Sequence, residues 1–302
     1  MRGIQRLIGY HGELNQISLA TEANMILDRF INKPGIGPLI LKQRHRAAVR
    51  SALSDARSRS NSLFAVKRAL GQAGSGLATT PERDLWKRIE RRRRELSERA
   101  DTVQDVDYGA GYPGSQYNED QQRRGVVTTI SVSELASFSK AAVWAEVLYH
   151  LTRVLRPQKV LEMGTCVGIS GSYIAAALQF NNQGRLWTIE GSLATAALAQ
   201  QTFQMLGLSD RVTSLVGPFH GMLDPCLKEQ KSFDLIFVDG HHDGKATVGY
   251  FRQLSQHLSP NAIIVFDDIN WSAGMAEAWR EISTDPSVKD FVHMGEMGAA
   301  AF

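Results

Sequence analysis

Carboxylate and imidazole side chains follow two short apolar runs in the second half of this sequence. Asp239 comes directly after one run, and Asp267 and Asp268 come directly after the next. His242 lies three residues beyond Asp239. Hard oxygen ligands of this kind suit Mg²⁺ or another divalent cation, such as Mn²⁺ or Ca²⁺, and a histidine beside them can act as a general base near neutral pH. The plainer alternative is that Asp267 caps a helix and Asp268 faces solvent.

Two glycines follow an earlier apolar run, where a ligand could approach the backbone closely. Gly164 and Gly168 allow a tight turn, and the helix that follows offers its amino-terminal N–H groups to a ligand. Glu190 ends the next run, 22 residues beyond Gly168, where a carboxylate can accept hydrogen bonds from ribose hydroxyls. Glu162, just before the turn, suits a ligand with an ammonium group better than one with a pyrophosphate. The spacing indicates a nucleoside-containing cofactor; a tight turn without a ligand is the alternative.

The elements that must position these residues alternate regularly from residue 131 onward. Five β-rich runs are separated by segments of helical periodicity, which predicts a parallel, doubly wound sheet. Ligands bind at the carboxyl ends of the strands in such a sheet. Two further apolar runs near 291–294 and 298–302 could add edge strands. The predicted strands are 159–163, 185–189, 212–216, 233–238 and 262–266, and the predicted helices are 139–155, 170–178, 193–206, 221–227 and 246–258.

Charge divides the chain near residue 100. Residues 1–100 carry 20 Lys and Arg against 9 Asp and Glu, whereas residues 101–302 carry 14 against 22. We therefore expect a basic, helical amino-terminal extension over 1–100 and a separate domain over 101–302. The segment 107–125 is rich in Gly and Tyr and predicts a loop, which suits a mobile lid and an inert linker equally well.

Helical signals dominate the basic extension. Thr80 is the predicted N-cap of a helix that has Pro81 in its first turn. The run 91–94 consists of four arginines, but glutamates interleaved with it favour a solvated helix over a nucleic-acid-binding one. The expected helical runs cover 39–60, 61–70 and 80–100, with a flexible break at 71–76.

The composition is that of a globular protein. Of 302 residues, 43% are hydrophobic and 22% charged, which argues against a disordered or fibrous chain. Two cysteines, Cys166 and Cys226, are too few for a disulfide framework. Charged residues interrupt the amino terminus before a signal-peptide core could form, and no stretch approaches 18 apolar residues. We expect a cytoplasmic protein without a membrane segment.

Taken in order, these motifs resemble the class I S-adenosylmethionine-dependent methyltransferases, whose fold is a Rossmann-like sheet of seven strands. Among them the chain is similar to the metal-dependent O-methyltransferases, typified by catechol O-methyltransferase and by the macrolide-sugar and aminocoumarin-sugar O-methyltransferases. The adjacent acids Asp267 and Asp268 are closer to the sugar-modifying branch than to the catechol branch, which has Asp-Asn. A group of uncharacterised bacterial methyltransferases resembles the chain more closely, over about residues 102–302. The resemblance rests on Glu162-x-Gly164-x-x-x-Gly168-x-Ser170, Thr188-Ile189-Glu190-Gly191, Gly217, Asp239-Gly240-x-His242 and Asp267-Asp268-Ile269-x-Trp271.

The resemblance implies S-adenosylmethionine as the cofactor. Glu162, Gly164 and Ser170 would hold its amino-acid end, Glu190 its ribose and the turn 217–220 its adenine. The full set of implied cofactor-binding residues is Glu162, Gly164, Thr165, Gly168, Ser170, Glu190, Gly191, Gly217, Phe219 and Asp239.

The resemblance also implies a divalent metal, Mg²⁺ or a similar ion, held by Asp239, Asp267 and Asp268. The catechol branch has a lysine as general base three residues after the first metal aspartate, and His242 stands at that position here. The catalytic residues would be His242 and Asp239. The acceptor would be a small molecule with a hydroxyl group, such as a secondary metabolite or a sugar, free or bound to a carrier protein. A homo-oligomer is expected.

Three other classes of protein compete with this interpretation. A nicotinamide-dependent oxidoreductase would use similar strand ends, but the usual G-x-G-x-x-G spacing is not found here. A metallohydrolase would draw its ligands from Asp239, His241, His242 and Asp243, which crowds four ligands into one loop. A nucleic-acid methyltransferase would use the basic first third, but Asp-Gly-His-His replaces the Asn/Asp-Pro-Pro-aromatic string of base N-methyltransferases. We therefore expect no nucleic-acid substrate.

Overall fold

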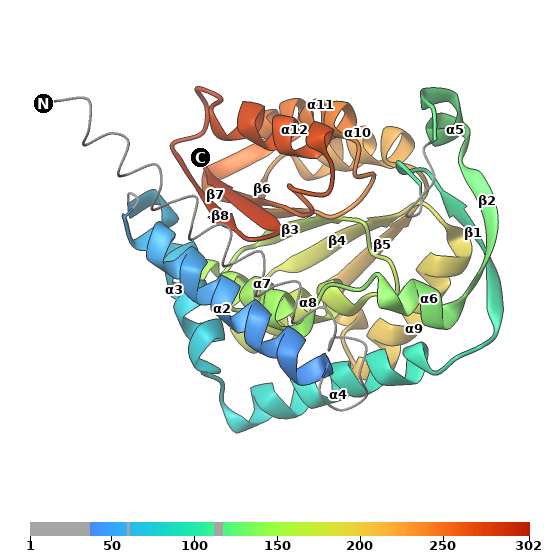
Figure 1. Ribbon diagram of the computed structural model, residues 1–302, viewed down its shortest axis with the longest axis horizontal. Coiled ribbons are helices and arrows are strands. Elements are labelled where there is room, and N and C mark those ends of the chain that lie inside the picture. The colour runs from blue at the N-terminus through green and yellow to red at the C-terminus, as the bar shows by residue number, and fades with distance from the viewer. Residues whose placement is uncertain (1–36, 59–60, 112–116) are drawn as a thin grey trace, which may run out of the picture. The chain divides into compact units, whose positions relative to one another are not determined.

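A seven-stranded sheet forms the centre of the compact unit Ala48–Phe302 (Figure 1). The computed structural model describes residues 37–58, 61–111 and 117–302. The strand order is β5-β4-β3-β6-β7-β9-β8, in which β9 alone runs antiparallel to its neighbours. The predicted α/β fold with a doubly wound sheet is confirmed. The strands are β3 (Lys159–Met163), β4 (Arg185–Glu190), β5 (Val212–Val216), β6 (Phe233–Val238), β7 (Leu258–Phe266), β8 (Asp290–Met294) and β9 (Met297–Ala301).

The chain changes direction across the sheet after β5. It first adds β4 and β5 on one side of β3, then returns to add β6 and β7 on the other side. A crevice opens at the carboxyl ends of the strands at such a point, because the neighbouring connections leave in opposite directions. The residues that follow β3 and β6 are therefore best placed to bind a ligand.

Helices cover both faces of the sheet, which is why most residues of its central strands are apolar and buried (Figure 1). Successive residues of β3 point to opposite faces. Val160 packs in the core that contains Trp144, whereas Leu161 packs in the core that contains Phe251. The five predicted helices are present, with ends that differ by four residues or fewer. One face bears α7 (Ala142–Leu155), α8 (Ile169–Asn181) and α9 (Leu193–Leu206), and the other bears α10 (Phe219–Gln230), α11 (Gly244–Leu254) and α12 (Ala273–Ser283).

The basic amino-terminal part joins the same core from Ala48 onward. Val49 and Leu70 belong to the hydrophobic cluster that contains Trp144 and Leu148 of α7. The change of charge near residue 100 therefore does not coincide with a boundary between compact units. The helical elements of this part are α2 (Gly37–Ser58), η1 (Asn61–Leu63), α3 (Phe64–Ser75) and α4 (Thr80–Ser97).

Two local predictions in this part are wrong. The flexible break predicted at 71–76 is mostly helix, because burial of Leu70 and Ala73 against the core offsets the weak helix propensity of the glycines. The chain leaves α3 only at Gly76, whose φ is 64°. The N-cap of α4 is Thr79 rather than Thr80, because Thr79 and Glu82 form a reciprocal capping box.

An antiparallel hairpin precedes the sheet and was not predicted. It consists of β1 (Thr102–Asp107) and β2 (Val126–Ser131), followed by α6 (Val132–Ser137). The segment 107–125, predicted as a loop, contains the short helix α5 (Glu119–Arg124); its residues Tyr112-Pro113-Gly114 lie outside the described residues. Thr195 of α9 donates a hydrogen bond from its Oγ1 to Asp105 at 2.6 Å, which ties the hairpin to the sheet's helices.

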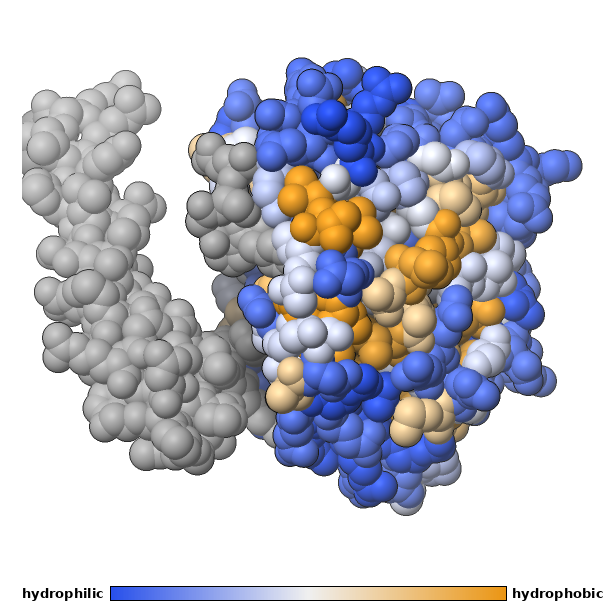
Figure 2. All heavy atoms as spheres, turned by 90° about the vertical axis from the view of Figure 1, so that its right-hand side faces the viewer, coloured by the Kyte–Doolittle hydropathy of each residue, from blue (hydrophilic) through white to orange (hydrophobic). Residues whose placement is uncertain are grey.

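Apolar side chains gather on the side of the molecule that bears the hairpin. Figure 2 shows them on the face where Figure 1 has β1, β2, α6 and α9. On these elements, Val127 of β2 and Leu193 of α9 are 64% and 74% exposed. Exposed apolar surface of this kind is suited to contact with another molecule. No helix among the described residues has both the length and the apolar character needed to cross a membrane.

Candidate active site

Backbone hydrogen bonds bring the predicted site residues to one edge of the sheet. Each residue that follows a strand donates its N–H to the carbonyl at the end of a neighbouring strand. The bonds run from Gly217 N to Glu190 O at 2.8 Å, from Gly164 N to Ile189 O at 3.0 Å, from Asp239 N to Met163 O at 2.8 Å and from Asp267 N to Val238 O at 2.9 Å. These bonds hold the ends of the five strands β5, β4, β3, β6 and β7 in register as one surface.

Gly164 is required where β3 and β6 end. Its φ is 104°, and a Cβ atom there would lie 1.8 Å from the backbone oxygen of Asp239. No side chain fits in that space. Gly168, with φ of 84°, ends the same turn at the start of α8. The two glycines let the turn after β3 lie directly against the loop after β6.

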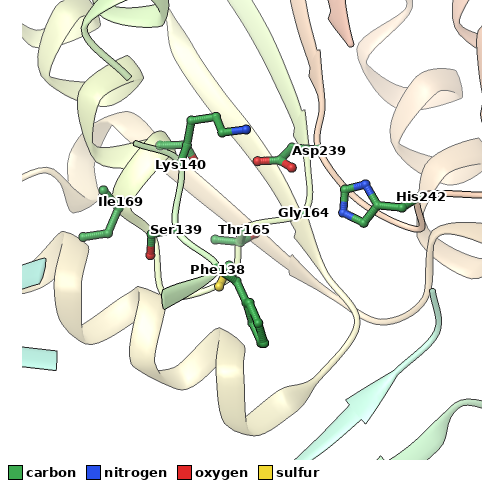
Figure 3. A pocket seen from close by; sticks show the side chains of 10 residues that line it. Phe138, Ser139, Lys140, Gly164, Thr165, Ile169, Asp239 and His242 are labelled. Carbon is green, nitrogen blue, oxygen red and sulfur yellow. The ribbon is translucent and has the colours of Figure 1, made fainter. Parts of the chain in front are cut away.

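A cavity of about 110 Å³ lies at this junction (Figure 3). Five residues predicted from the sequence line it: Gly164, Thr165, Ser170, Asp239 and His242. Sequence reasoning missed the other five, which are Phe138, Ser139 and Lys140 before α7, Cys166 in the turn after β3, and Ile169 at the start of α8. The cavity lies at the crevice where the fold favours ligand binding.

Asp239, His242 and Asp268 converge on the β6–β7 side of the site. Their potential ligand atoms all lie within 4.8 Å of one another, and His242 Nδ1 is 3.4 Å from Asp268 Oδ2. Burial and the neighbouring Asp267 carboxylate raise the pKa of both Asp239 and Asp268 above the usual range. Two carboxylates and an imidazole at this spacing fit a divalent cation, which would relieve the repulsion.

Asp267, predicted as a third metal ligand, lies beside Asp239 and pairs with Lys140. The Lys140 ammonium lies against Asp267 Oδ2, with Glu296 Oε1 at 3.7 Å. Burial lowers the pKa of Lys140, but attraction to Asp267 and Asp239 outweighs it and raises that pKa overall. Asp267 Oδ1 is buried without a hydrogen-bond partner. No motif pointed to Lys140, because it lies 127 residues from its partner.

Two glutamates occupy the β3–β4 side of the site. The Glu190 carboxylate accepts hydrogen bonds from the backbone N–H groups of Cys166, at 2.8 Å, and Ser192, at 3.0 Å. Glu162 is fully buried and accepts a hydrogen bond from Thr188 Oγ1 at 2.6 Å; its Oε1 is buried without a partner. Burial raises the pKa of each glutamate to about 7. Neither glutamate lines the cavity.

The remaining predicted cofactor residues also lie outside the cavity. Tyr108, at the end of β1, packs over Gly191, where a Cβ atom would lie 2.7 Å from Tyr108 Cδ2. Phe219 packs edge to face against Tyr250, with ring centroids 5.6 Å apart. Gly217, with φ of 145°, leads into α10. None of Gly191, Gly217 and Phe219 lines the cavity.

His241 and Asp243 have structural partners. His241 Nδ1 lies 2.6 Å from the Tyr250 hydroxyl, and its Nε2 lies 2.8 Å from Gln122 Oε1. Since the Gln122 oxygen can only accept, Nε2 carries the proton and Nδ1 accepts from Tyr250. Asp243 caps α11 by accepting from Ala246 N at 2.9 Å. The four-ligand cluster of a metallohydrolase is therefore not formed.

Comparisons with known proteins place the chain in a family. Residues 161–269 match a family model described as a methyltransferase domain. The chain is 27% identical to a catechol O-methyltransferase of Niastella koreensis over 172 residues, 57% of this chain and 75% of that protein. It is 30% identical to a catechol O-methyltransferase of Mycobacterium tuberculosis over 153 residues, 50% of this chain and 67% of that protein. The chain belongs to the class I S-adenosylmethionine-dependent O-methyltransferases.

Solved structures include similar chains. An O-methyltransferase from Bacillus cereus in complex with S-adenosylhomocysteine is 21% identical, with a TM-score of 0.47, and the match covers 56% of this chain and 86% of that one. As a member of this O-methyltransferase family, the chain is an enzyme that uses S-adenosylmethionine. Membership of this family excludes the two competing interpretations as a nicotinamide-dependent oxidoreductase and as a metallohydrolase.

Proposed function

We propose that this O-methyltransferase transfers a methyl group to a hydroxyl oxygen of a small molecule, with a divalent cation at Asp239 and Asp268 and with His242 as the general base. The observation that carries the proposal is the convergence of these three side chains within 4.8 Å. Asp239 and His242 also line the cavity at the junction of β3 and β6. The proton acceptor, the cation site and the cavity thus share one location.

The methyl donor is assigned to the β3–β4 side. S-adenosylmethionine supplies an electrophilic methyl group on a sulfonium. Glu190 keeps unused acceptor capacity, because a carboxylate has about four lone-pair sites and the backbone N–H groups of Cys166, Gly191 and Ser192 do not occupy all of them. It can therefore accept hydrogen bonds from ribose hydroxyls. The unpartnered Oε1 of Glu162 suits a nearby ammonium group, since burial of a lone carboxylate oxygen is costly.

The proton of the acceptor hydroxyl is assigned to His242. Its side chain is 31% exposed, and Asp268 Oδ2, 3.4 Å from Nδ1, is placed to orient the ring. A divalent cation bound to the neighbouring aspartates would lower the pKa of a hydroxyl that it contacts. The role of the protein is then to align the oxygen with the methyl group and to exclude water.

The acceptor class follows from the cavity's surroundings. Phe138, 44% exposed, lines the cavity, and the Trp271 ring lies 6.1 Å from that of His242. These exposed aromatic faces suit an acceptor with an apolar or planar body. The relatives' name, catechol O-methyltransferase, points the same way. We propose an acceptor with two neighbouring oxygen atoms, in a secondary metabolite or a sugar, free or attached to a carrier protein.

Methyl transfer and cofactor binding test the proposal together. Calorimetry should detect binding of S-adenosylhomocysteine and none of NAD. Labelled S-adenosylmethionine should methylate catechol or a sugar with adjacent hydroxyls in the presence of Mg²⁺, and a chelator should abolish the reaction. His242→Ala should lower turnover by about 100-fold or more while the affinity for S-adenosylhomocysteine stays within about twofold.

The matched control is His257→Ala, because His257 lies at the amino end of β7, away from the cavity. It should leave turnover unchanged. Full turnover of His242→Ala would remove the histidine from the mechanism. A loss of Mn²⁺ affinity in that variant would make His242 a metal ligand rather than the base.

A further inference from the structure

The loop that carries His242 has an unfavourable backbone conformation. His241 and His242 are consecutive residues with φ of 72° and 48°, in the left-handed region. A Cβ atom disfavours this region, so residues other than glycine adopt it where surrounding contacts hold them there. In this conformation the His242 ring is directed toward Asp239 (Figure 3). The position of His242 therefore depends on the contacts that hold the loop.

Three hydrogen bonds hold His241, the residue before the proposed base. Its ring nitrogens lie 2.6 Å from the Tyr250 hydroxyl and 2.8 Å from Gln122 Oε1. Its backbone oxygen accepts a hydrogen bond from the N–H of Ala110 at 2.7 Å. Tyr250 belongs to α11, whereas Ala110 and Gln122 belong to the connection between β1 and β2. Gln122 lies 119 residues from His241 in the sequence, so the fold alone brings them together.

Gln122 is itself held in place. Its Nε2 donates a hydrogen bond to the backbone oxygen of Tyr117 at 2.9 Å, so its Oε1 is the atom that faces His241. The backbone N–H of Tyr117 donates in turn to the backbone oxygen of Ala110 at 3.2 Å. Ala110, Tyr117 and Gln122 thus form one hydrogen-bonded unit, the tether, and two of its members bond to His241.

The tether and His241 lie away from the reacting groups. Neither Gln122 nor His241 lines the cavity. His241 is also absent from the group of potential ligand atoms that contains His242. Any effect of the tether on the reaction must therefore pass through the position of His242.

We propose that Gln122 is a positioning residue, which fixes His241 and through it holds the ring of His242 in place for proton removal. The inference rests on the proposed function, because it takes His242 as the general base. Proton transfer is sensitive to small displacements of the base, so a looser loop should slow turnover without weakening cofactor binding. The connection between β1 and β2 then contributes to the reaction from outside the cavity.

Turnover of Gln122→Leu tests the proposal, with labelled S-adenosylmethionine, catechol and Mg²⁺. The kcat should fall by about tenfold or more, whereas the KM for S-adenosylmethionine should stay within about twofold. In a His242→Ala background the same substitution should lower kcat by less than about twofold, because its effect passes through His242. An equal loss in both backgrounds would make Gln122 a merely structural residue and overturn the proposal.

Gln104→Leu is the matched control, because Gln104 lies in β1 and donates from its Nε2 to Thr129 Oγ1 at 2.8 Å. The same substitution there removes one hydrogen bond from the hairpin and leaves the contacts of His241 intact. Its kcat should stay within about twofold of the wild-type value. A loss as large as that of Gln122→Leu would assign the effect to hairpin stability and overturn the proposal.

Hydrogen exchange of the Ala110 backbone N–H measures the tether without any acceptor. Exchange should be at least about tenfold faster in Gln122→Leu than in the wild type, because loss of one bond favours opening of the loop. If Gln122→Leu does not fold, Tyr250→Phe removes the other ring partner of His241 and should accelerate the same exchange. Unchanged exchange in the folded variants would overturn the proposal.

The proposed function fails separately. If the wild type methylates no hydroxyl acceptor, the assigned reaction is wrong, and hydrogen exchange still decides whether the tether holds His241. If methylation occurs and Gln122→Leu keeps the wild-type kcat, the proposed function stands and the role of Gln122 is overturned.

Discussion

The two halves of the sheet's carboxyl edge differ in the groups that stabilise their carboxylates. On the β3–β4 side, Glu190 accepts two backbone hydrogen bonds and Glu162 accepts one from a threonine hydroxyl. On the β6–β7 side, Asp239 and Asp268 face each other and His242, and Asp267 faces a lysine. Neutral donors balance one half, whereas in the other half several carboxylates surround the ammonium group of Lys140.

This difference indicates which kind of ligand each half can bind. Neutral hydrogen-bond donors orient a carboxylate and leave it free to accept further bonds from hydroxyls, which suits a nucleoside. Carboxylates that face one another repel, and a cation is the group that stabilises them. In our proposal, carboxylates thus serve recognition of the cofactor on one side and of a metal on the other.

The largest expected effect comes from a substitution that forces the two halves of the carboxyl edge apart. Gly164→Ala places a Cβ atom 1.8 Å from the Asp239 backbone oxygen, so the turn after β3 must move away from the loop after β6. We expect a loss of stability of about 4 kcal/mol or more, measured by chemical denaturation. Binding of S-adenosylhomocysteine and of Mn²⁺ should both be lost. Gly249→Ala in α11, where a Cβ atom has no neighbour within 4 Å, should instead be neutral or slightly stabilising.

Two variants, each of which removes one carboxylate charge, test whether the two halves bind their ligands independently. Asp239→Asn should weaken Mn²⁺ binding by about 100-fold and leave binding of S-adenosylhomocysteine within a few fold. Glu190→Gln should do the reverse and weaken S-adenosylhomocysteine by about tenfold, because one acceptor of the ribose hydroxyls is replaced. Calorimetry with each ligand measures both effects. If either variant weakens both ligands equally, the two halves do not act separately.

The last expected effect concerns pH and Glu162. Burial raises the pKa of Glu162 from 4.5 to about 7, so between these values the folded protein retains a proton that the unfolded chain has lost. Stability should therefore fall as pH rises through this window. Glu162→Gln removes this dependence: we expect no stability difference near pH 4 and an advantage on the order of 3 kcal/mol at pH 8. Denaturation curves at both pH values measure it, and equal curves at pH 8 would contradict the buried charge.

Much of the fold could be predicted from the sequence because its signals are local. The strands β3, β5 and β6 have the predicted bounds, since runs of apolar residues between polar turns define buried parallel strands. The order of the strands then places Asp239 and Asp267 after neighbouring strands at one edge. The N-cap of α4 was predicted one residue too late. Two adjacent threonines can each cap a helix, and only Thr79 forms the capping box with Glu82.

Other features depend on contacts between distant segments. The hairpin of β1 and β2 has no continuous apolar run and is stabilised by the pairing of its two strands and by the hydrogen bond from Thr195 to Asp105. Burial against α7 keeps α3 helical through its glycines. Neither the pairing of the hairpin strands nor the burial of α3 can be recognised from the local sequence.

The sequence by itself determined the sheet, the glycine turn and the row of acids at the strand ends, because each depends on residue type and short-range spacing. Only the tertiary structure decided how those acids are balanced. In the folded chain, Asp267 pairs with Lys140, 127 residues away. Asp239, Asp268 and His242 lie in one group. His241 forms hydrogen bonds with Tyr250 and Gln122. The physical reason is that a buried charge is governed by whatever packs against it, and those neighbours come from elsewhere in the chain.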